Sequence, residues 1–272
     1  SNSFDTDEGF KYYLAEQKEK NPFLKYIVGQ HGMGYNFKKA TISFQEREIA
    51  DNVFVWGKYT ENKNQIPGFI LKSSKINYNK EGKILIICTH LGFREQYWDK
   101  DYFFTKNFNR KILFLNSFKN KFLNNNIILR LGTRINEFNF NEEKKIKNKF
   151  PKLKIDLNNN IYKSYASSRL VIHFYLATTF LETVSQNIPS IMLMDKKEFN
   201  YSNKGMSIFK MLKKNNILFD DSKKLHSFIE KNYNNLEKWW CSKKIQSSLN
   251  IFRRDYCRNG KLRHIADIIK NI

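Results

Sequence analysis

The sequence predicts an α/β protein built mainly on a doubly wound parallel sheet, with a helical tail at its C-terminal end. Short, continuous apolar runs recur along the chain, as at 170–174 and 190–194, and such runs are typical of strands buried on both faces. Segments with apolar residues at helical spacing separate these runs, which favours parallel strands joined by helices. From 236 to 269 the spacing is helical almost throughout.

The first part of the chain is predicted to alternate helices and short strands before a polar connection. Its predicted elements are a helix capped by Asp5, Thr6 or Asp7 and running toward Lys18, a strand at 24–28, a helix at 44–50 and a strand at 53–56. The segment 61–81 is polar, lacks regular spacing and contains Pro67, which predicts a linker between two domains.

The remainder of the chain is predicted to be a second α/β unit. Its strands are expected at 83–89, 127–131, 153–156, 170–174, 190–194 and 217–219, with helices at 95–118, 161–167, 178–188, 205–213 and 221–233. Right-handed crossovers would place the loops after Thr89, Leu131, Phe174 and Asp195 along one edge of the sheet, where open α/β sheets bind ligands. One stripe of the helical tail is predicted to be core: Ile245, Leu249, Phe252 and Tyr256.

The composition disfavours several classes of protein. The 272 residues carry a formal net charge of +22 and are 41% hydrophobic, enough for real cores. Lys residues are spread over the whole chain, which disfavours a nucleic-acid interface and leaves attraction to anionic headgroups or a phosphate-bearing substrate. No stretch approaches the roughly 20 apolar residues of a membrane span. Cys88, Cys241 and Cys257 have neither disulfide nor zinc spacing, which favours a cytoplasmic setting.

Two adjacent hydroxyls open the helix predicted after 170–174. Thr178 and Thr179 there would join free backbone N–H groups and the positive end of the helix dipole, which together make a phosphate seat. Capping of the helix explains a Thr at this position equally well. Glu182, one turn later, is a candidate to bind sugar hydroxyls or an ordinary solvent-exposed residue. Arg130 is a candidate phosphate contact or a surface ion pair.

A loop rich in glycine, VGQHGMGYN at 28–36, follows the first predicted strand. Its glycines permit close backbone approach, and it presents His31 at the carboxyl edge of that strand. A lone His is more often structural than functional. Flanked by Gln30 and Gly32, and followed by the acidic Glu46 and Glu48, His31 is a better candidate for chemistry than a lone His elsewhere.

Three pieces of the sequence together resemble one bacterial family. They are QHGMGY at 30–35, EREIADNVFVWG at 46–57 and ATTFLETVSQNIPSIM at 177–192, followed by a Trp–Trp pair and a helical tail. The chain is similar to the surface-carbohydrate transferases with GT-B-like architecture, whose pieces usually have the form QHGG-Y-G and IAD-WGW. It departs from that form at Met33, Asn36 and Lys58, and it has Leu131–Gly132 where related transferases often carry His–Pro.

The resemblance implies two Rossmann-like domains that face each other across a cleft. Residues 1–75 would be the C-terminal part of the acceptor-side domain plus a linker. Residues 76–272 would be the nucleotide-sugar-binding domain with its C-terminal helices. The implied site residues are His31 with Glu46 or Glu48 as base for catalysis, and Gln30, Gly32, Arg130, Thr178, Thr179 and Glu182 for binding. Since Glu46 and Glu48 are two residues apart on a helix, one would face the cleft and the other solvent.

The resemblance therefore implies a glycosyltransferase that moves a sugar from a nucleotide-activated donor to a cell-surface carbohydrate acceptor. The helix end would stabilise the leaving phosphate without a metal, and the nucleotide sugar would be the co-substrate in place of a cofactor. Such an enzyme of polysaccharide or lipopolysaccharide synthesis would be cytoplasmic, with peripheral contact to an anionic membrane. The alternatives are a CDP-alcohol polyol-phosphate transferase, a nucleotide-sugar epimerase, and a basic module that binds nucleic acid or anionic lipid.

Overall fold

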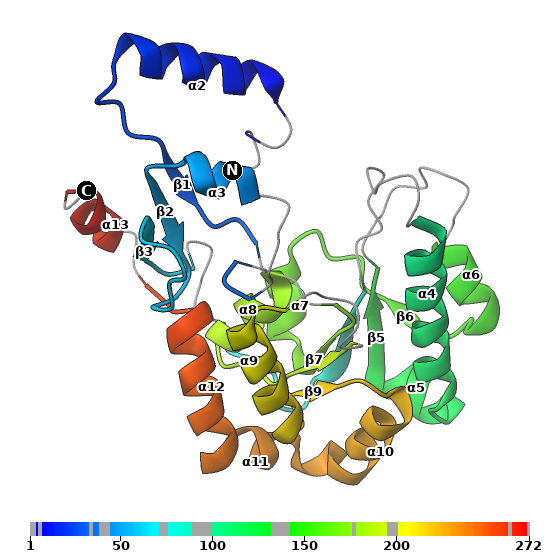
Figure 1. Ribbon diagram of the computed structural model, residues 1–272. Helices are drawn as coiled ribbons and strands as arrows, with labels where there is room; N and C mark the ends of the chain where they lie inside the picture. Colours follow the sequence, from blue (N-terminus) through cyan, green and yellow to red (C-terminus); the bar gives the residue numbers. More distant parts are fainter. Residues whose placement is uncertain are drawn as a thin grey trace.

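The protein contains two parallel sheets, each with its own helices. The computed structural model describes residues 4, 7–32, 35–37, 44–70, 76–88, 100–131, 142–175, 178–194, 201–260 and 263–270. A three-stranded sheet has the order β1-β2-β3, and a six-stranded sheet has the order β6-β5-β4-β7-β8-β9. In Figure 1 the smaller sheet lies at the upper left and the larger one below it. The predicted α/β class with parallel strands is confirmed.

The small unit surrounds the three-stranded sheet. Its elements are α2 (Glu8–Lys20), β1 (Ile27–Gly29), α3 (Phe44–Ile49), β2 (Asn52–Val55) and β3 (Gln65–Pro67). Asp7 caps α2 as expected, because its carboxylate accepts the Phe10 N–H at 3.1 Å. The strand β3 pairs with β2 inside the segment expected to be irregular. That expectation was wrong there because three residues ending in a proline carry no periodic apolar signal.

The large unit surrounds the six-stranded sheet. Its strands are β4 (Lys83–Ile87), β5 (Ile127–Arg130), β6 (Lys154–Ile155), β7 (Ser168–His173), β8 (Ser190–Leu193) and β9 (Leu218–Phe219). Its helices are α4 (Lys100–Asn116), α5 (Asn120–Asn126), α6 (Glu142–Lys149), α7 (Ile161–Ala166), α8 (Thr178–Ser185), α9 (Asn203–Lys214) and α10 (Ser222–Asn232). Within the described residues, no helix has the length and hydrophobicity that crossing a membrane requires.

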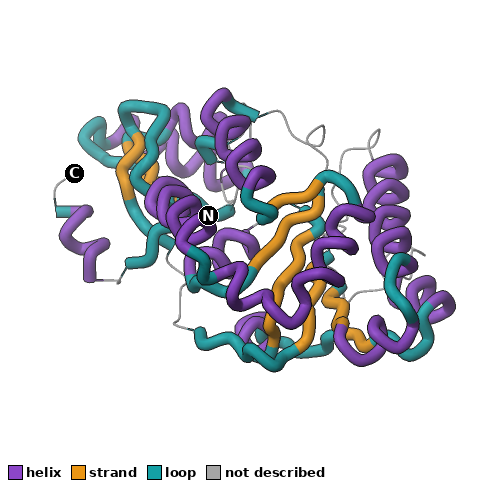
Figure 2. The backbone as a smooth tube through the Cα atoms, turned by 90° about the horizontal axis from the view of Figure 1, so that it is seen from below, coloured by secondary structure: helices purple, strands orange, loops and turns teal. Residues whose placement is uncertain are grey.

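Helices cover both faces of the large sheet, as a doubly wound fold requires. Side chains alternate along β4, so that Ile84 and Ile86 pack in the cluster that contains Phe114 of α4. Leu85 and Ile87 point the other way and pack with Tyr165 of α7. Figure 2 shows helices on both sides of the six strands.

The tail is mostly helical, as predicted, and its described residues are divided into three helices. After the 3₁₀ turn η2 (Tyr233–Asn235) come α11 (Leu236–Trp240), α12 (Lys243–Tyr256) and α13 (Arg263–Ile269). The break after α12 exists because the chain there returns to the small sheet, where Asn259 forms a parallel bridge with Ile70. The stripe predicted to be core is buried along its whole length.

The end of α12 joins the two units through the backbone. The Lys58 N–H donates to the Arg254 carbonyl at 2.8 Å, and the Arg258 N–H donates to the Trp56 carbonyl at 2.7 Å. A Cβ at Gly57 would lie 2.0 Å from the Asp255 carbonyl oxygen, so only glycine fits between these segments. We call residues 56–58 and 254–258 the backbone seam. It fixes the carboxyl end of β2 against the large unit.

We expect Gly57→Ala to destabilise the protein by about 1–3 kcal/mol, because the added methyl group must push the seam apart. Gly29→Ala is the matched control, since a Cβ at Gly29 meets no atom within 4 Å. Urea denaturation gives the free energy of unfolding of both variants. Equal stability of the two variants would contradict the claim that only glycine fits at position 57 of the backbone seam.

Candidate functional site

The carboxyl ends of β1 and β7 meet where the two units touch. The loop after β1 carries His31, and its next residue, Gly32, lies against the first turn of α8. A Cβ at Gly32 would be 3.3 Å from the Thr178 Oγ1. A cavity of about 10 Å³ between the two units, lined by residues that include Gln30 and Leu181, has room for about one water. The glycine loop and the helix start, predicted separately, therefore lie together.

The large unit also holds the far side of the glycine loop. The Ser202 N–H, at the start of α9, donates to the Phe37 carbonyl at 3.1 Å. A Cβ at Gly205 would lie 2.0 Å from that same carbonyl oxygen. Asn36 has a φ of 55°, in the left-handed region that glycine adopts readily and Asn tolerates. The asparagine that replaces a common glycine of the family pattern is therefore compatible with the backbone of the loop.

His31 is half-buried and held by residues that the sequence did not single out. The Tyr35 hydroxyl lies 3.0 Å from His31 Nδ1, and the two rings meet edge to face. The guanidinium of Arg47, on α3, lies 5.0 Å from the centroid of the Tyr35 ring. Burial lowers the pKa of Arg47. Helix α3 thus reaches His31 through Arg47 and Tyr35.

The carboxamide of Gln30 shapes the loop. Its Nε2 donates to the Gly32 carbonyl at 2.8 Å, and its Oε1 accepts the Trp56 N–H at 2.8 Å. Gln30 is buried, 7% exposed. These two contacts hold Gly32 in place beside Thr178, while the contact of Gln30 with a substrate stays a prediction.

The two acidic candidates on α3 have different surroundings. Glu46 is buried and accepts the Tyr26 hydroxyl at 2.9 Å. Tyr26 directly precedes β1, whereas His31 follows that strand. Glu48 is exposed. Glu46 is therefore turned into the small unit and Glu48 is turned to solvent, while the expectation that one of them faces the cleft stays a prediction.

The two threonines of α8 differ in their contacts. Thr179 Oγ1 lies 3.1 Å from Nδ1 of His173, the last residue of β7. His173 Nε2 lies 3.1 Å from Thr183 Oγ1, and Thr183 donates to the Phe180 carbonyl at 3.1 Å. Burial lowers the pKa of His173 to about 3, so the ring is neutral at physiological pH. The apolar run predicts His173 only as part of a buried strand, although a His in such a run signals buried polar partners.

Glu182 faces the large unit. It is 8% exposed, and it accepts the Tyr165 hydroxyl at 3.2 Å. Burial and the neighbouring Glu182 together raise the pKa of Tyr165 well above its usual value. The solvent-exposed alternative for Glu182 is therefore wrong, while its binding of sugar hydroxyls stays a prediction.

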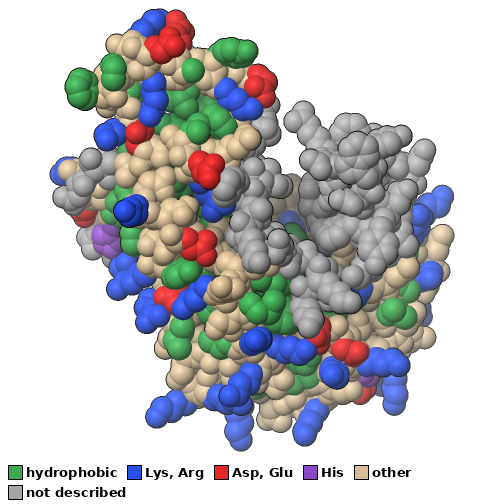
Figure 3. Space-filling model, viewed as in Figure 1, with side chains coloured by type: hydrophobic (Ala, Val, Ile, Leu, Met, Phe, Trp, Pro, Cys, Tyr) green, Lys and Arg blue, Asp and Glu red, His purple; other side chains and the backbone are tan. Residues whose placement is uncertain are grey.

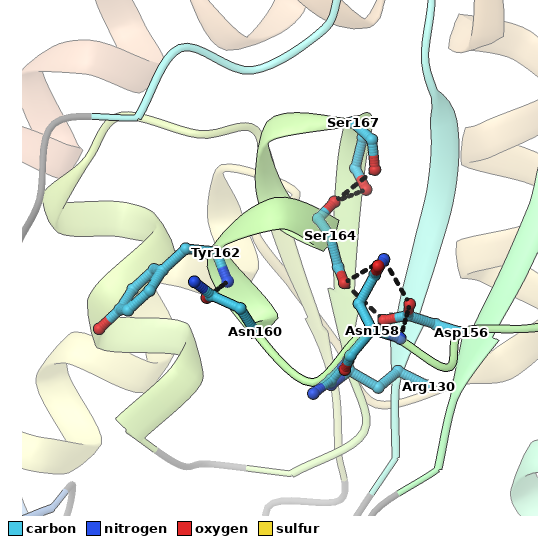
Figure 4. A network of polar contacts seen from close by, with 8 residues as sticks. Arg130, Asp156, Asn158, Asn160, Tyr162, Ser164 and Ser167 are labelled. Carbon is cyan, nitrogen blue, oxygen red and sulfur yellow. Dashed lines mark hydrogen bonds and ion pairs between the residues drawn. The ribbon is translucent and has the colours of Figure 1, made fainter.

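Arg130, at the end of β5, forms an ion pair, as its alternative role required, but the pair is largely buried and does not lie on the surface. Its Nη1 lies 2.6 Å from the Asp156 carboxylate and donates to the Asn158 carbonyl at 3.0 Å. Asp156 also accepts the Ser164 hydroxyl at 2.6 Å. Figure 4 shows these groups converging between β5 and α7. The Arg130 contact with phosphate stays a prediction.

A further buried polar cluster lies at the end of β4. The Lys111 ammonium pairs with the Glu142 carboxylate, and both side chains are almost fully buried. Burial raises the pKa of the adjacent Cys88 thiol to about 12, so it stays protonated. Within the described ranges, no three His, Cys, Asp or Glu side chains are grouped to hold a metal ion.

Asp156 makes the stability of the large unit depend on pH. Burial by itself would raise the pKa of Asp156, but hydrogen bonds from Ser164 and Arg130 outweigh it, so the pKa lies below its usual value. A carboxyl group of this kind stabilises the fold above its unfolded-state pKa of about 3.9, and the contribution is lost as pH falls through the lower folded pKa.

We expect Asp156→Asn to lower the free energy of unfolding at pH 7 by about 1–3 kcal/mol. The variant also loses part of the decline in stability below about pH 4. Urea titrations at several pH values measure both effects. Asp220→Asn, which breaks an exposed pair with Lys213, is the control. If the free energy of unfolding of Asp156→Asn declined with falling pH as that of the wild type does, Asp156 would not be the source of the decline.

Comparison with known proteins places the chain in a family. No curated protein matches it. MurG from Acinetobacter baumannii is similar at 12% identity and a TM-score of 0.47, over 94% of this chain and 69% of that chain. The glycosyltransferase of kitacinnamycin is similar at 9% identity and a TM-score of 0.41, over 85% of this chain and 57% of that one. A family model described as LIC12162 family transferase matches residues 1–272. Since the match spans the whole chain, the protein belongs to the LIC12162 family of transferases.

Proposed function

We propose that this transferase moves a sugar from a nucleotide-activated donor to a cell-surface carbohydrate acceptor. The observation that carries the proposal is the close approach of Gly32 to Thr178, since a Cβ added at Gly32 would lie 3.3 Å from the Thr178 Oγ1. This approach brings the loop that carries His31 in the small unit against a helix start of the large unit. A transfer between two bound substrates needs such a pair of facing groups.

The donor phosphates would bind at the start of α8. Backbone N–H groups of the first turn and the positive end of the helix dipole stabilise negative charge there, and the Thr178 hydroxyl adds a donor. The charge that develops on a departing nucleotide falls on those phosphate oxygens, so the helix end lowers the barrier without a metal. Glu182, beside Tyr165, would bind sugar or ribose hydroxyls.

The acceptor would approach from the small unit. A neutral His31 that accepts the Tyr35 proton at Nδ1 carries its own proton on Nε2, which can donate to a hydroxyl or carboxylate oxygen of either substrate. Glu48 would serve as the base, because its side chain is exposed whereas Glu46 is buried against Tyr26.

Surface charge supports an anionic partner. The net charge is +22, and Lys and Arg side chains are visible on both units in Figure 3. Such a surface favours a phosphate-bearing donor and an acceptor linked to an anionic lipid at the membrane surface. The nucleotide itself is to be identified by a thermal-shift panel of CMP, CDP, UDP, GDP and their sugars, because specific ligands raise the unfolding temperature. A shift with CDP-alcohols alone would replace the sugar by a polyol phosphate.

We expect Thr178→Val to raise the dissociation constant of the best nucleoside diphosphate about tenfold, because one charge-assisted hydrogen bond is lost. Thr178→Ser keeps the hydroxyl and should bind like the wild type. Isothermal titration calorimetry compares the three proteins. An unchanged constant in Thr178→Val would reduce that residue to helix capping.

We expect His31→Ala to lower the turnover number at least about a hundredfold while the nucleotide dissociation constant changes less than about twofold. Tyr35→Phe, which only loosens the imidazole, should fall between this variant and the wild type. Product formation with the identified donor measures the rates. Wild-type turnover by His31→Ala would remove the imidazole from the mechanism.

A further inference from the structure

An arginine on α3 begins a line of three side chains that ends at His31. The guanidinium carbon of Arg47 lies 5.0 Å from the centroid of the Tyr35 ring, within the range of a cation–π contact. The Tyr35 hydroxyl lies 3.0 Å from His31 Nδ1. Arg47 is 6% exposed and Tyr35 is 4% exposed, so water screens the charge only weakly. Arg47 belongs to a piece of the sequence in which only the two glutamates were candidates.

The guanidinium keeps its positive charge in this position. Burial lowers its pKa, whereas the phenol of Tyr35 and the carboxylates of Glu61 and Glu48 act in the opposite direction. An arginine side chain stays protonated in proteins at physiological pH. Glu48 and Glu61 are exposed, so water screens their charges, and the buried Glu46 accepts the Tyr26 hydroxyl. A positive charge therefore lies over the phenol ring.

The hydrogen bond between Tyr35 and His31 can run in two directions. Either the hydroxyl donates to Nδ1 and the neutral imidazole carries its proton on Nε2, or an Nδ1–H donates to the hydroxyl oxygen. A cation over the phenol ring stabilises negative charge on that oxygen, so the hydroxyl becomes a stronger donor and a weaker acceptor. The same charge opposes a ring N–H that points its proton at the phenol. The charge of Arg47 therefore favours donation by the hydroxyl.

The direction of this bond decides what His31 can do for a substrate. When Nδ1 accepts the hydroxyl proton, the other ring nitrogen bears the only N–H of the neutral imidazole. Nε2 then donates a hydrogen bond and cannot take a proton from an acceptor sugar. Proton removal falls to another group, for which Glu48 is the candidate.

We propose that Arg47 is a positioning residue of the transfer site: its charge over the Tyr35 ring directs the hydroxyl proton to His31 Nδ1 and makes His31 a hydrogen-bond donor in place of a base. The inference rests on the proposed function, because it assumes that His31 meets a substrate. It gives the arginine between the two acidic candidates a role and separates the work of His31 from that of Glu48.

The first test reads the imidazole directly and needs no substrate. Long-range ¹H–¹⁵N correlation spectra give the tautomer of each histidine, and His31→Ala assigns the His31 signals by their loss. The wild type should carry the His31 proton on Nε2. Arg47→Met, which has a similar length but no charge, should raise the share of the Nδ1–H form about threefold. An Nδ1–H ring in the wild type, or an unchanged share in Arg47→Met, would overturn the proposal.

Three further variants separate charge from packing. Arg47→Lys keeps a cation and should keep the wild-type tautomer, and an effect equal to that of Arg47→Met would overturn the role of the charge. Lys25→Met removes an exposed positive charge elsewhere in the small unit and should leave His31 unchanged. Tyr35→Phe removes the donor, so the Nδ1–H share should rise there too. That variant tests the line of contacts even if Arg47→Met does not fold.

The pH at which the His31 ring gains charge is a second readout. Loss of a neighbouring cation makes an imidazolium easier to form, so the ring should titrate about half a pH unit higher in Arg47→Met than in the wild type. Arg47→Lys should titrate like the wild type. Glu48 and Glu61, the acidic groups that act on Arg47, are the same in all of these proteins. A purely structural arginine would leave the titration unchanged, and that result would overturn the proposal.

The last measurement connects Arg47 to transfer. Release of nucleotide from UDP-, GDP- and CMP-activated sugars gives the turnover number, and calorimetry with the free nucleotides gives the dissociation constant. We expect Arg47→Met to lower turnover about tenfold and to change the dissociation constant less than about twofold, with Arg47→Lys close to the wild type.

Wild-type turnover by Arg47→Met, together with a changed tautomer, would overturn the role of Arg47 in transfer. If the wild type releases nucleotide from none of the three sugars, the proposed function fails, and the role of Arg47 at a transfer site fails with it. The spectra still decide the direction of the bond between Tyr35 and His31 in that case, so the two failures are distinguishable.

Discussion

The close approach of Gly32 to Thr178 is the constraint on which the rest of the site depends. A side chain at position 32 would begin 3.3 Å from the Thr178 hydroxyl oxygen, so the loop and the helix start share one small space. Two further arrangements keep that space constant. Gln30 binds the Gly32 carbonyl and the Trp56 N–H, and the backbone seam at Gly57 binds the end of β2 to α12. Without either arrangement, the loop that carries His31 would not be held against the start of α8.

Several features of the fold and site follow from local patterns in the sequence. Apolar runs predicted the strands of the large sheet, Asp7 predicted the first helix cap, and helical spacing predicted the buried stripe of α12. The glycine loop and the paired threonines predicted two places that the structure brings together. Patterns of this kind succeed because burial and capping act on neighbours in the chain.

Other features depend on partners far along the chain and have no local signal. Arg130 pairs with Asp156, which lies 26 residues away in the sequence, and Glu46 accepts a hydrogen bond from Tyr26. The strand β3 pairs although it is short and contains a proline, because β2 lies beside it. His173 is hidden within an apolar run. In each case the tertiary contact, and not the residue type, determines what the side chain does.

The return of the tail to the small sheet has a consequence for synthesis of the protein. Residues 27–70 leave the ribosome well before residues 258–259, yet the bridge at Ile70 and the hydrogen bond at Trp56 are made with those later residues. Contacts with so large a separation in sequence form slowly. The small unit therefore completes its structure only after the tail has been synthesised, and heat or denaturant should melt both units in a single cooperative transition.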